Sequence, residues 1–330
     1  MATLAGMRRS RVLLAAAAVG GAGVAKRALD GPTARWDTNP DHCDGDPLGL
    51  PDTTEIEVTA ADGARLQGHR CGDPSGPTVL LVHGYIESVE FWAPVVRRLA
   101  ESGLDVVLVD QRGHGCSERG TAPFEPDTLA GDIRSWVESL DLRDAILVGH
   151  SMGGVSAMAF SAAHPEVAAA RLRSQVLVAT LAFPEPLFGL PDIEVDARRV
   201  VGLLEQVMKR EVLALLFVSR VFGTWPTRPA LEATRQGIMR TDRQTRIDAM
   251  AMLRDFDLRP HLPSIDLPTV VVAGSHDQLT PLAGNELIAD AIPGARLEVL
   301  PGMGHMLMFE APDAVTDAIV QATKPADAAR

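Results

Sequence analysis

One stretch of the chain, from Asp144 to Phe160, constrains the fold more than any other. The apolar run Ala145 to Val148 suits a strand buried on both faces, and the small and apolar residues after Gly154 suit a helix. Between them stands G-x-S-x-G, written here Gly149-His150-Ser151-Met152-Gly153. So abrupt a turn strains its central residue, and glycines let strand and helix approach closely. The pattern predicts a serine hydroxyl clear of the sheet; the alternative interpretation is a glycine-rich turn with an incidental serine.

Further apolar strands alternate with helical patterns on both sides of this stretch. Residues 78–82, 105–109, 174–180, 269–273 and 296–300 suit buried or partly buried strands, and residues 53–58 and 64–69 alternate around an Asp-Gly turn as a β-hairpin does. Strands that alternate with helices predict an α/β fold with a mostly parallel central sheet. We expect helices on both faces of this sheet and antiparallel strands from the N-terminal hairpin.

The alternation stops between residues 183 and 262. This segment contains several prolines between helical patterns, and strands resume after it. We therefore predict an α/β core formed by residues 53–182 and 263–323, with a helical insertion over residues 183–262. Residues 31–52, rich in Asp, Gly and Pro, are predicted to form a linker or arm.

Residues 1–30 have the pattern of a signal or anchor segment. Arg8, Arg9 and Arg11 precede a run of small and apolar residues from Val12 to Ala25. This predicts an exported or membrane-tethered protein, with possible membrane association through this segment. Positive charges at Lys26 and Arg27 favour the alternative of a cytoplasmic protein.

Composition excludes several classes of function. The formal net charge of −12 argues against nucleic-acid binding by phosphate neutralisation. The spacing of the three cysteines gives no zinc signature, and no metal or other cofactor is expected. In an oxidising compartment Cys43 could pair with Cys71, whereas Cys116 is expected to lie far from both; three free thiols are the alternative.

Polar residues follow the apolar strands at their carboxyl ends, where ligands bind in such sheets. Asp277 follows the strand at 269–273 and His305 follows the strand at 296–300. A serine needs a base to remove its proton and an acid to orient that base, which predicts Ser151 as nucleophile, His305 as base and Asp277 as acid. His276 is a competitor for the base. Asp255 and Asp257, at the end of the insertion, are alternatives for the acid.

Such chemistry also needs donors for the negative charge on a carbonyl oxygen. The backbone N–H of Met152, at the start of a helix, is one predicted donor, and that of Tyr85 is the other. Gly84 is expected to allow the tight turn before Tyr85, and His83 to hold this loop by hydrogen bonds without transferring protons. Gly149, His150 and Gly153 are predicted to support the turn around Ser151.

These motifs resemble those of the α/β-hydrolase superfamily, of the esterase, lipase and perhydrolase kind. The resemblance covers residues 53–323 and rests on HGY, DQRGHGCS, GHSMGG, GSHDQLTP and GMGHMLMFE. It implies that residues 183–262 form a cap over the active site and that residues 110–115 are mainly structural. Epoxide hydrolases and dehalogenases of the superfamily carry an aspartate where this chain has Ser151.

The resemblance and the triad together predict a cofactor-independent hydrolase of small carboxylic esters with an apolar acyl group. Perhydrolysis, carbon–carbon bond hydrolysis and a catalytically silent binding protein are the alternatives. Six residues of the insertion could line an acyl pocket or could equally be its own packing: Met208, Leu215, Leu216, Phe217, Phe222 and Trp225.

Overall fold

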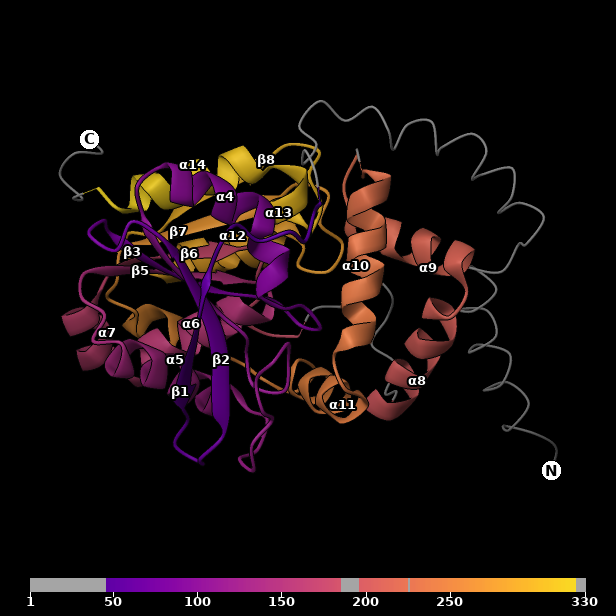
Figure 1. The fold of residues 1–330 in the computed structure, drawn as a ribbon, viewed down its shortest axis with the longest axis horizontal. Coiled ribbons are helices and arrows are strands. Elements are labelled where there is room, and N and C mark those ends of the chain that lie inside the picture. The colour runs from indigo at the N-terminus through magenta and orange to yellow at the C-terminus, as the bar shows by residue number, and fades with distance from the viewer. Residues whose placement is uncertain (1–45, 185–195, 225, 325–330) are drawn as a thin grey trace.

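A computed structural model describes residues 46–184, 196–224 and 226–324. Eight strands form one sheet in the order β1-β2-β4-β3-β5-β6-β7-β8 (Figure 1). β1 pairs antiparallel with β2, and β2 pairs antiparallel with β4, whereas all later neighbours are parallel. The predicted fold class is therefore confirmed. The strands are β1 (Thr54–Thr59), β2 (Arg65–Gly72), β3 (Thr78–Val82), β4 (Asp105–Val109), β5 (Ala145–His150), β6 (Leu172–Val178), β7 (Thr269–Gly274) and β8 (Arg296–Leu300).

Helices cover both faces of this sheet, as its apolar strands require. Successive residues of one strand serve opposite faces: Leu80 and Val82 lie in one apolar cluster, and Val79 and Leu81 lie in the other. The first face is covered by α5 (Pro126–Ser139), α6 (Met152–Ala163), α7 (Pro165–Arg171) and α12 (Leu282–Ala291). The second is covered by α4 (Ala93–Glu101), α13 (Leu307–Glu310) and α14 (Pro312–Ala322).

Prolines stand near the start of two helices on this second face. The 3₁₀ turn η1 (Val89–Trp92) leads directly into α4, which has Pro94 near its start. The last helix is split at Ala311, because Pro312 disfavours helical geometry in the residue before it. The split matters for the site, since α13 follows directly after His305.

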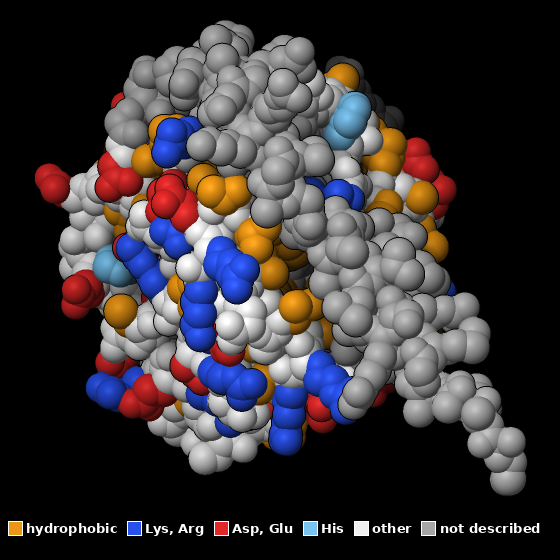
Figure 2. Space-filling view, turned by 90° about the vertical axis from the view of Figure 1, so that its right-hand side faces the viewer, with side chains coloured by type: hydrophobic (Ala, Val, Ile, Leu, Met, Phe, Trp, Pro, Cys, Tyr) orange, Lys and Arg blue, Asp and Glu red, His pale blue; other side chains and the backbone are white. Residues whose placement is uncertain are grey.

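In the described residues between β6 and β7, four helices lie on one side of the sheet (Figure 1). They are α8 (Ala197–Met208), α9 (Glu211–Val218), α10 (Arg228–Arg240) and α11 (Arg243–Met252), with the 3₁₀ turns η3 (Ser219–Val221) and η4 (Leu262–Ser264). We call residues 196–262 the helical insertion. Figure 2 faces its outer side, where Lys and Arg side chains are interspersed with apolar ones; those exposed on and just after α8 include Arg198, Arg199, Lys209 and Arg210.

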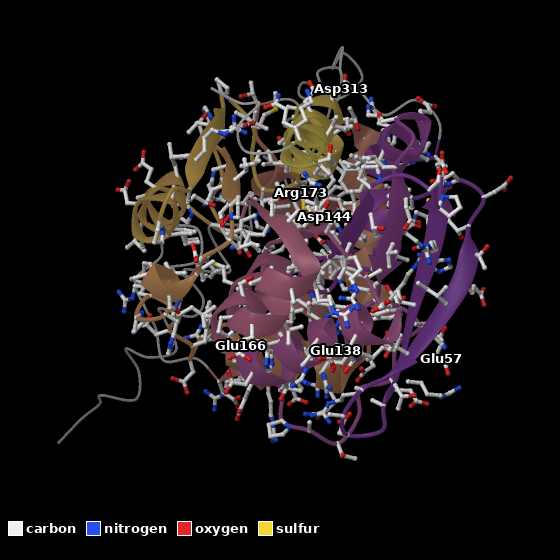
Figure 3. All side chains as sticks on the ribbon, turned by 90° about the vertical axis from the view of Figure 1, so that its left-hand side faces the viewer. Glu57, Glu138, Asp144, Glu166, Arg173 and Asp313 are labelled. Carbon is white, nitrogen blue, oxygen red and sulfur yellow. The ribbon has the colours of Figure 1, made fainter. Side chains whose placement is uncertain are left out.

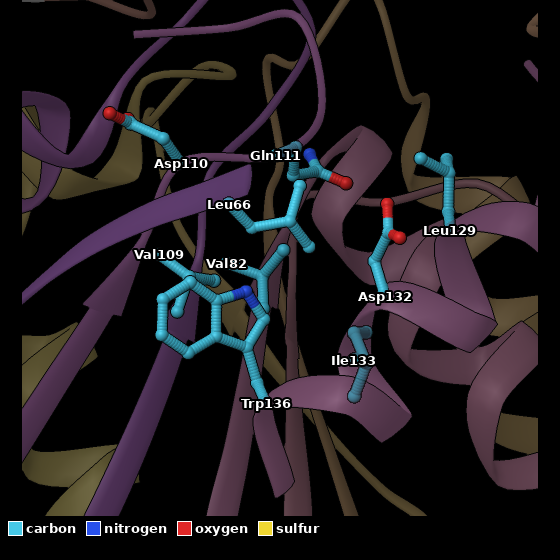
Figure 4. A pocket seen from close by; sticks show the side chains of 9 residues that line it. All are labelled: Leu66, Val82, Val109, Asp110, Gln111, Leu129, Asp132, Ile133 and Trp136. Carbon is cyan, nitrogen blue, oxygen red and sulfur yellow. The ribbon is translucent and has the colours of Figure 1, made fainter. Parts of the chain in front are cut away.

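The opposite side of the molecule carries charged residues around α5, α7 and β6 (Figure 3). Glu57, Glu138 and Glu166 are exposed there, and Arg173 pairs with Asp144. A small, mainly apolar cavity lies between the strands and α5, with Trp136, Leu66 and Ile133 among its walls (Figure 4). This cavity belongs to the packing of the core.

Several expectations concern residues outside the described part of the chain. The signal-like segment 1–30, most of the predicted arm and Cys43 lie there, so the Cys43–Cys71 pairing stays a prediction. Cys71 and Cys116 are not bonded to each other, and burial with the nearby Asp105 raises the pKa of the Cys71 thiol to about 11. Within the described ranges, no helix is both long enough and apolar enough to span a bilayer.

Candidate active site

Ser151 stands between β5 and α6, at the turn that the sequence predicts. Its backbone has φ 52° and ψ −117°, which is a strained conformation for a residue with a side chain. A Cβ on Gly149 would lie 2.3 Å from the carbonyl oxygen of Gly153, and one on Gly153 would lie 2.3 Å from that of Val82. These contacts explain the flanking glycines, because any side chain there would push strand and helix apart.

A hydrogen-bonded chain joins the three predicted catalytic side chains. Ser151 Oγ lies 3.1 Å from His305 Nε2, and His305 Nδ1 lies 2.8 Å from Asp277 Oδ2. All three residues are less than a tenth exposed. The strands β5, β7 and β8 bring them together, since each residue follows the carboxyl end of one of these strands.

The carboxylate of Asp277 is fully hydrogen-bonded. Its Oδ1 accepts the N–H groups of Leu279 and Thr280 at 2.8 and 2.9 Å, and its Oδ2 accepts the Thr280 hydroxyl at 2.6 Å. Burial raises the pKa of this carboxyl, but the positive charge that His305 can carry and the hydrogen bonds outweigh burial and lower the pKa below its ordinary value. Asp277 therefore stays ionised.

His305 shows the complementary change. Burial alone would lower the pKa of its ring, but the charge and hydrogen bond of Asp277 raise the pKa above its ordinary value. The two rival acids, Asp255 and Asp257, do not contact this histidine. Asp255 is exposed, Asp257 pairs with Arg259, and the carboxylate that pairs with the His305 ring is that of Asp277. The rival base His276 is exposed and contacts Ser275 Oγ.

The two predicted backbone donors lie on the elements expected of them. Met152 is the first residue of α6, where an N–H has no intrahelical acceptor. Tyr85 lies in the loop after β3, and neither of these N–H groups bonds to another described residue. The Tyr85 hydroxyl donates to the Arg246 carbonyl oxygen at 2.8 Å, so this loop is also tied to α11 of the insertion.

The buried ring of His83 is hydrogen-bonded to the same loop. Its Nε2 accepts the Gln111 N–H at 3.0 Å, which leaves Nδ1 to donate to the Gly84 carbonyl oxygen at 2.8 Å. Burial lowers the pKa of His83 to about 4, so the ring is neutral. These bonds connect the loop after β3 to the residues after β4.

The sequence model for the α/β hydrolase fold matches residues 77–312, which is most of the chain. The chain belongs to the α/β-hydrolase family. A non-heme haloperoxidase of Rhodococcus erythropolis is 32% identical over 263 residues, covering 75% of this chain and 92% of that protein. A putative carbamate hydrolase of Caulobacter is 31% identical over 272 residues, covering 80% of this chain and 97% of that protein.

Solved structures show the same fold. An esterase from Exiguobacterium antarcticum superimposes with a TM-score of 0.71 and 26% identity, covering 81% of this chain and 98% of the esterase. The family thus spans proteins named for different reactions, and membership by itself leaves the reaction of this hydrolase open.

Two buried glutamates of this hydrolase, Glu87 and Glu310, contact the site, although no sequence motif identified them. Glu87, after the loop of Tyr85, contacts His150. Glu310, at the end of α13, accepts the N–H groups of Gly223, Gly304 and Met306. Burial raises the pKa of Glu310 to about 7, although these three donors act in the opposite direction.

Backbone contacts also join the His305 loop to the insertion. The His305 N–H donates to the Val221 carbonyl oxygen at 2.8 Å, and the Thr224 N–H donates to that of Gly302 at 2.8 Å. The approach requires glycine, because a Cβ on Gly223 would lie 2.1 Å from the Gly302 oxygen. The loop with the candidate base is therefore paired with residues 221–224.

The six candidate pocket residues of this hydrolase fall into three groups. Met208, Leu215 and Phe222 are buried in the apolar cluster shared with α4 and α13, and Phe217 packs against it. Leu216 is half-buried, and Trp225 lies outside the described residues. No group of three metal-binding side chains occurs in the parts of the chain that the structure describes.

Proposed function

We propose that this chain is a serine hydrolase that cleaves small carboxylic esters with an apolar acyl group. The observation that carries the proposal is the hydrogen-bonded chain from Ser151 through His305 to Asp277. In the first step Ser151 Oγ attacks the ester carbonyl carbon while His305 Nε2 takes the hydroxyl proton. The carbon–oxygen bond to the alcohol then breaks, and His305 returns the proton to the leaving alcohol.

Water completes the cycle. It attacks the acyl group on Ser151 as His305 again accepts a proton, and the acid leaves as Ser151 regains its hydrogen. Asp277 holds the His305 ring in the orientation that keeps Nε2 toward the serine. The N–H groups of Met152 and Tyr85 are the proposed donors to the oxyanion in both steps.

The proposal is tested by labelling and by substitution. A fluorophosphonate should add to Ser151, as measured by peptide mass spectrometry, and p-nitrophenyl esters of increasing acyl length should be hydrolysed. Ser151→Ala and His305→Ala should each lower kcat by on the order of 10⁴ or more, because members of a triad act as a unit. Ser161→Ala is the matched control, since Ser161 is a buried serine of α6, the helix that follows Ser151, and its hydroxyl donates to Gln175. More than a few per cent residual activity in Ser151→Ala would contradict the assignment.

Perhydrolysis is the second candidate, favoured by the 32% identity to a protein named as a non-heme haloperoxidase. This reaction passes through the same acyl group on Ser151. Hydrogen peroxide attacks the acyl carbon in place of water, the bond from that carbon to Ser151 Oγ breaks, and the peracid is released while Ser151 regains its proton. The assay supplies an acetate ester, hydrogen peroxide and bromide. Any peracid that forms oxidises the bromide, and the oxidised bromide is measured. Oxidation that persists in Ser151→Ala would exclude this route.

A further inference from the structure

A buried acid–base pair, Glu87 and His150, lies beside the candidate nucleophile and has no part in the proton transfers above. His150 is fully buried and Glu87 is 7% exposed. Glu87 Oε2 lies 3.0 Å from His150 Nδ1. A buried carboxylate is costly unless it is paired, and this imidazole is its direct side-chain partner.

Hydrogen bonds at both ring nitrogens fix the orientation of His150. Its Nε2 is 3.0 Å from the backbone carbonyl oxygen of His305, which can only accept, so Nε2 donates. Its Nδ1 faces Glu87. Burial raises the pKa of the Glu87 carboxyl, but His150 and the Gly84 N–H outweigh burial and leave this pKa below its usual range. A hydrogen bond therefore joins Nδ1 to this carboxyl group, and the imidazole ring is held at both nitrogens.

The pair touches three separate elements of the site. Glu87 Oε2 also accepts the Gly84 N–H at 2.7 Å, directly before Tyr85. His150 is the residue before Ser151, and its ring reaches the main chain of His305. A Cβ on Gly84 would lie 2.9 Å from both Glu87 Oε2 and His150 Nδ1, so the loop needs glycine to reach the pair.

We propose that Glu87 and His150 form a positioning pair that fixes the Tyr85 loop, Ser151 and His305 relative to one another. The inference rests on the proposed function and deepens it. Neither residue touches the reacting atoms; both act through the three groups that do. Backbone strain in the same loop, with φ 56° at Ile86, indicates a conformation that the surrounding contacts must hold in place.

The consequence is a loss of transition-state binding when the pair is removed. Because small displacements of reacting groups cost about 10²-fold in rate, Glu87→Ala should lower kcat by roughly that factor with KM little changed. A trifluoromethyl ketone, which forms an oxyanion on Ser151, should lose affinity in parallel with kcat/KM. Glu87→Gln retains the size of the side chain and an acceptor for the Gly84 N–H but replaces the carboxyl group beside His150 by an amide, so a loss of about tenfold in kcat is expected.

Asp62→Ala is the matched control. Asp62 also uses one carboxylate to brace a loop, accepting the N–H groups of Thr121 and Ala122 at 2.8 Å each. It lies in the β1–β2 turn, at the far edge of the sheet from Ser151. Its loss should lower the melting temperature while leaving kcat and the ketone affinity within about threefold of wild type.

The experiment separates this inference from the proposed function. Fluorophosphonate labelling of wild-type Ser151 tests the function first, and ¹⁵N NMR of the histidine rings tests the pair in the resting protein. The expected spectrum has a His150 Nδ1 resonance, assigned by its absence in His150→Phe, that shifts in Glu87→Gln because the hydrogen-bond partner of Nδ1 changes. If Ser151 is labelled but Glu87→Ala keeps kcat/KM within about threefold, the positioning role is wrong.

A double substitution covers the case in which Glu87→Ala fails to fold. If the pair works as a unit, Glu87→Gln combined with His150→Phe should cost little more in kcat than the worse single change. Fully additive losses in kcat would overturn the proposal. So would a His150 Nδ1 resonance that has the same position in Glu87→Gln as in the wild type.

Discussion

Removal of the Glu310 carboxylate should destabilise the protein strongly and in a graded way. Its two oxygens accept the N–H groups of Gly223, Gly304 and Met306 at 2.6 to 3.1 Å. Glu310 is 3% exposed, so these donors have little access to water. In Glu310→Ala all three lose their partner, and at about 1–3 kcal/mol for each unpaired group the free energy of unfolding should fall by roughly 3–9 kcal/mol.

Glu310→Gln should cost much less. A glutamine oxygen placed at Oε2 still accepts from Gly223 and Gly304, and only the Met306 N–H then meets an amide group that cannot accept. The expected loss is about 1–2 kcal/mol. Because burial raises the pKa of Glu310 to about 7, the comparison is made at pH 8, where the wild-type carboxyl is mostly ionised.

Urea unfolding followed by tryptophan fluorescence measures both variants, with the m-value checked for constancy. Three results would refute this reasoning: a loss below about 1 kcal/mol in Glu310→Ala, equal losses in the two variants, or a larger loss in the glutamine variant. Since Gly304 and Met306 flank His305, the alanine variant should also lose kcat. The same preparation therefore reports on stability and on the position of the base.

Two further changes test the electrostatics of the site and the role of the insertion. Asp277→Asn removes the charge that raises the pKa of His305. Because only neutral His305 can accept a proton, the acid limb of the pH profile of kcat/KM should move to lower pH. The plateau value of kcat/KM should fall by roughly 10²–10⁴-fold. An unmoved limb would contradict the assignment of the acid. Phe217→Ala, in the half-buried part of α9, should change the ratio of kcat/KM between short and long acyl esters by about tenfold or more. A lower melting temperature with an unchanged ratio would instead indicate packing alone.

The sheet and the candidate triad could be predicted because each depends on short stretches of sequence. The apolar runs of β3, β4, β5 and β7 suit only strands buried on both faces, and parallel strands place their carboxyl ends together. That rule brings Ser151, Asp277 and His305 to one edge, although 126 and 28 positions separate them in the chain.

The two glutamates could not be predicted in this way. A lone glutamate in a loop or at a helix end usually points to solvent. The partners of Glu87 and Glu310 include His150 and Gly223, which are 63 and 87 residues away in sequence. Only the assembled fold shows that these carboxylates face backbone N–H groups and an imidazole.

The pairing of residues 221–224 with the loop of His305 bears on how this protein could be engineered. Exchanging the insertion of one hydrolase for that of another is an obvious way to alter substrate preference. Here such a graft would also remove the Val221 carbonyl oxygen and the Gly223 N–H that hold the base and Glu310. A graft that replaces the insertion on either side but keeps residues 219–224 of this chain would preserve these contacts with the His305 loop. In this chain the working boundary between scaffold and exchangeable module therefore runs through the insertion itself, between α9 and α10.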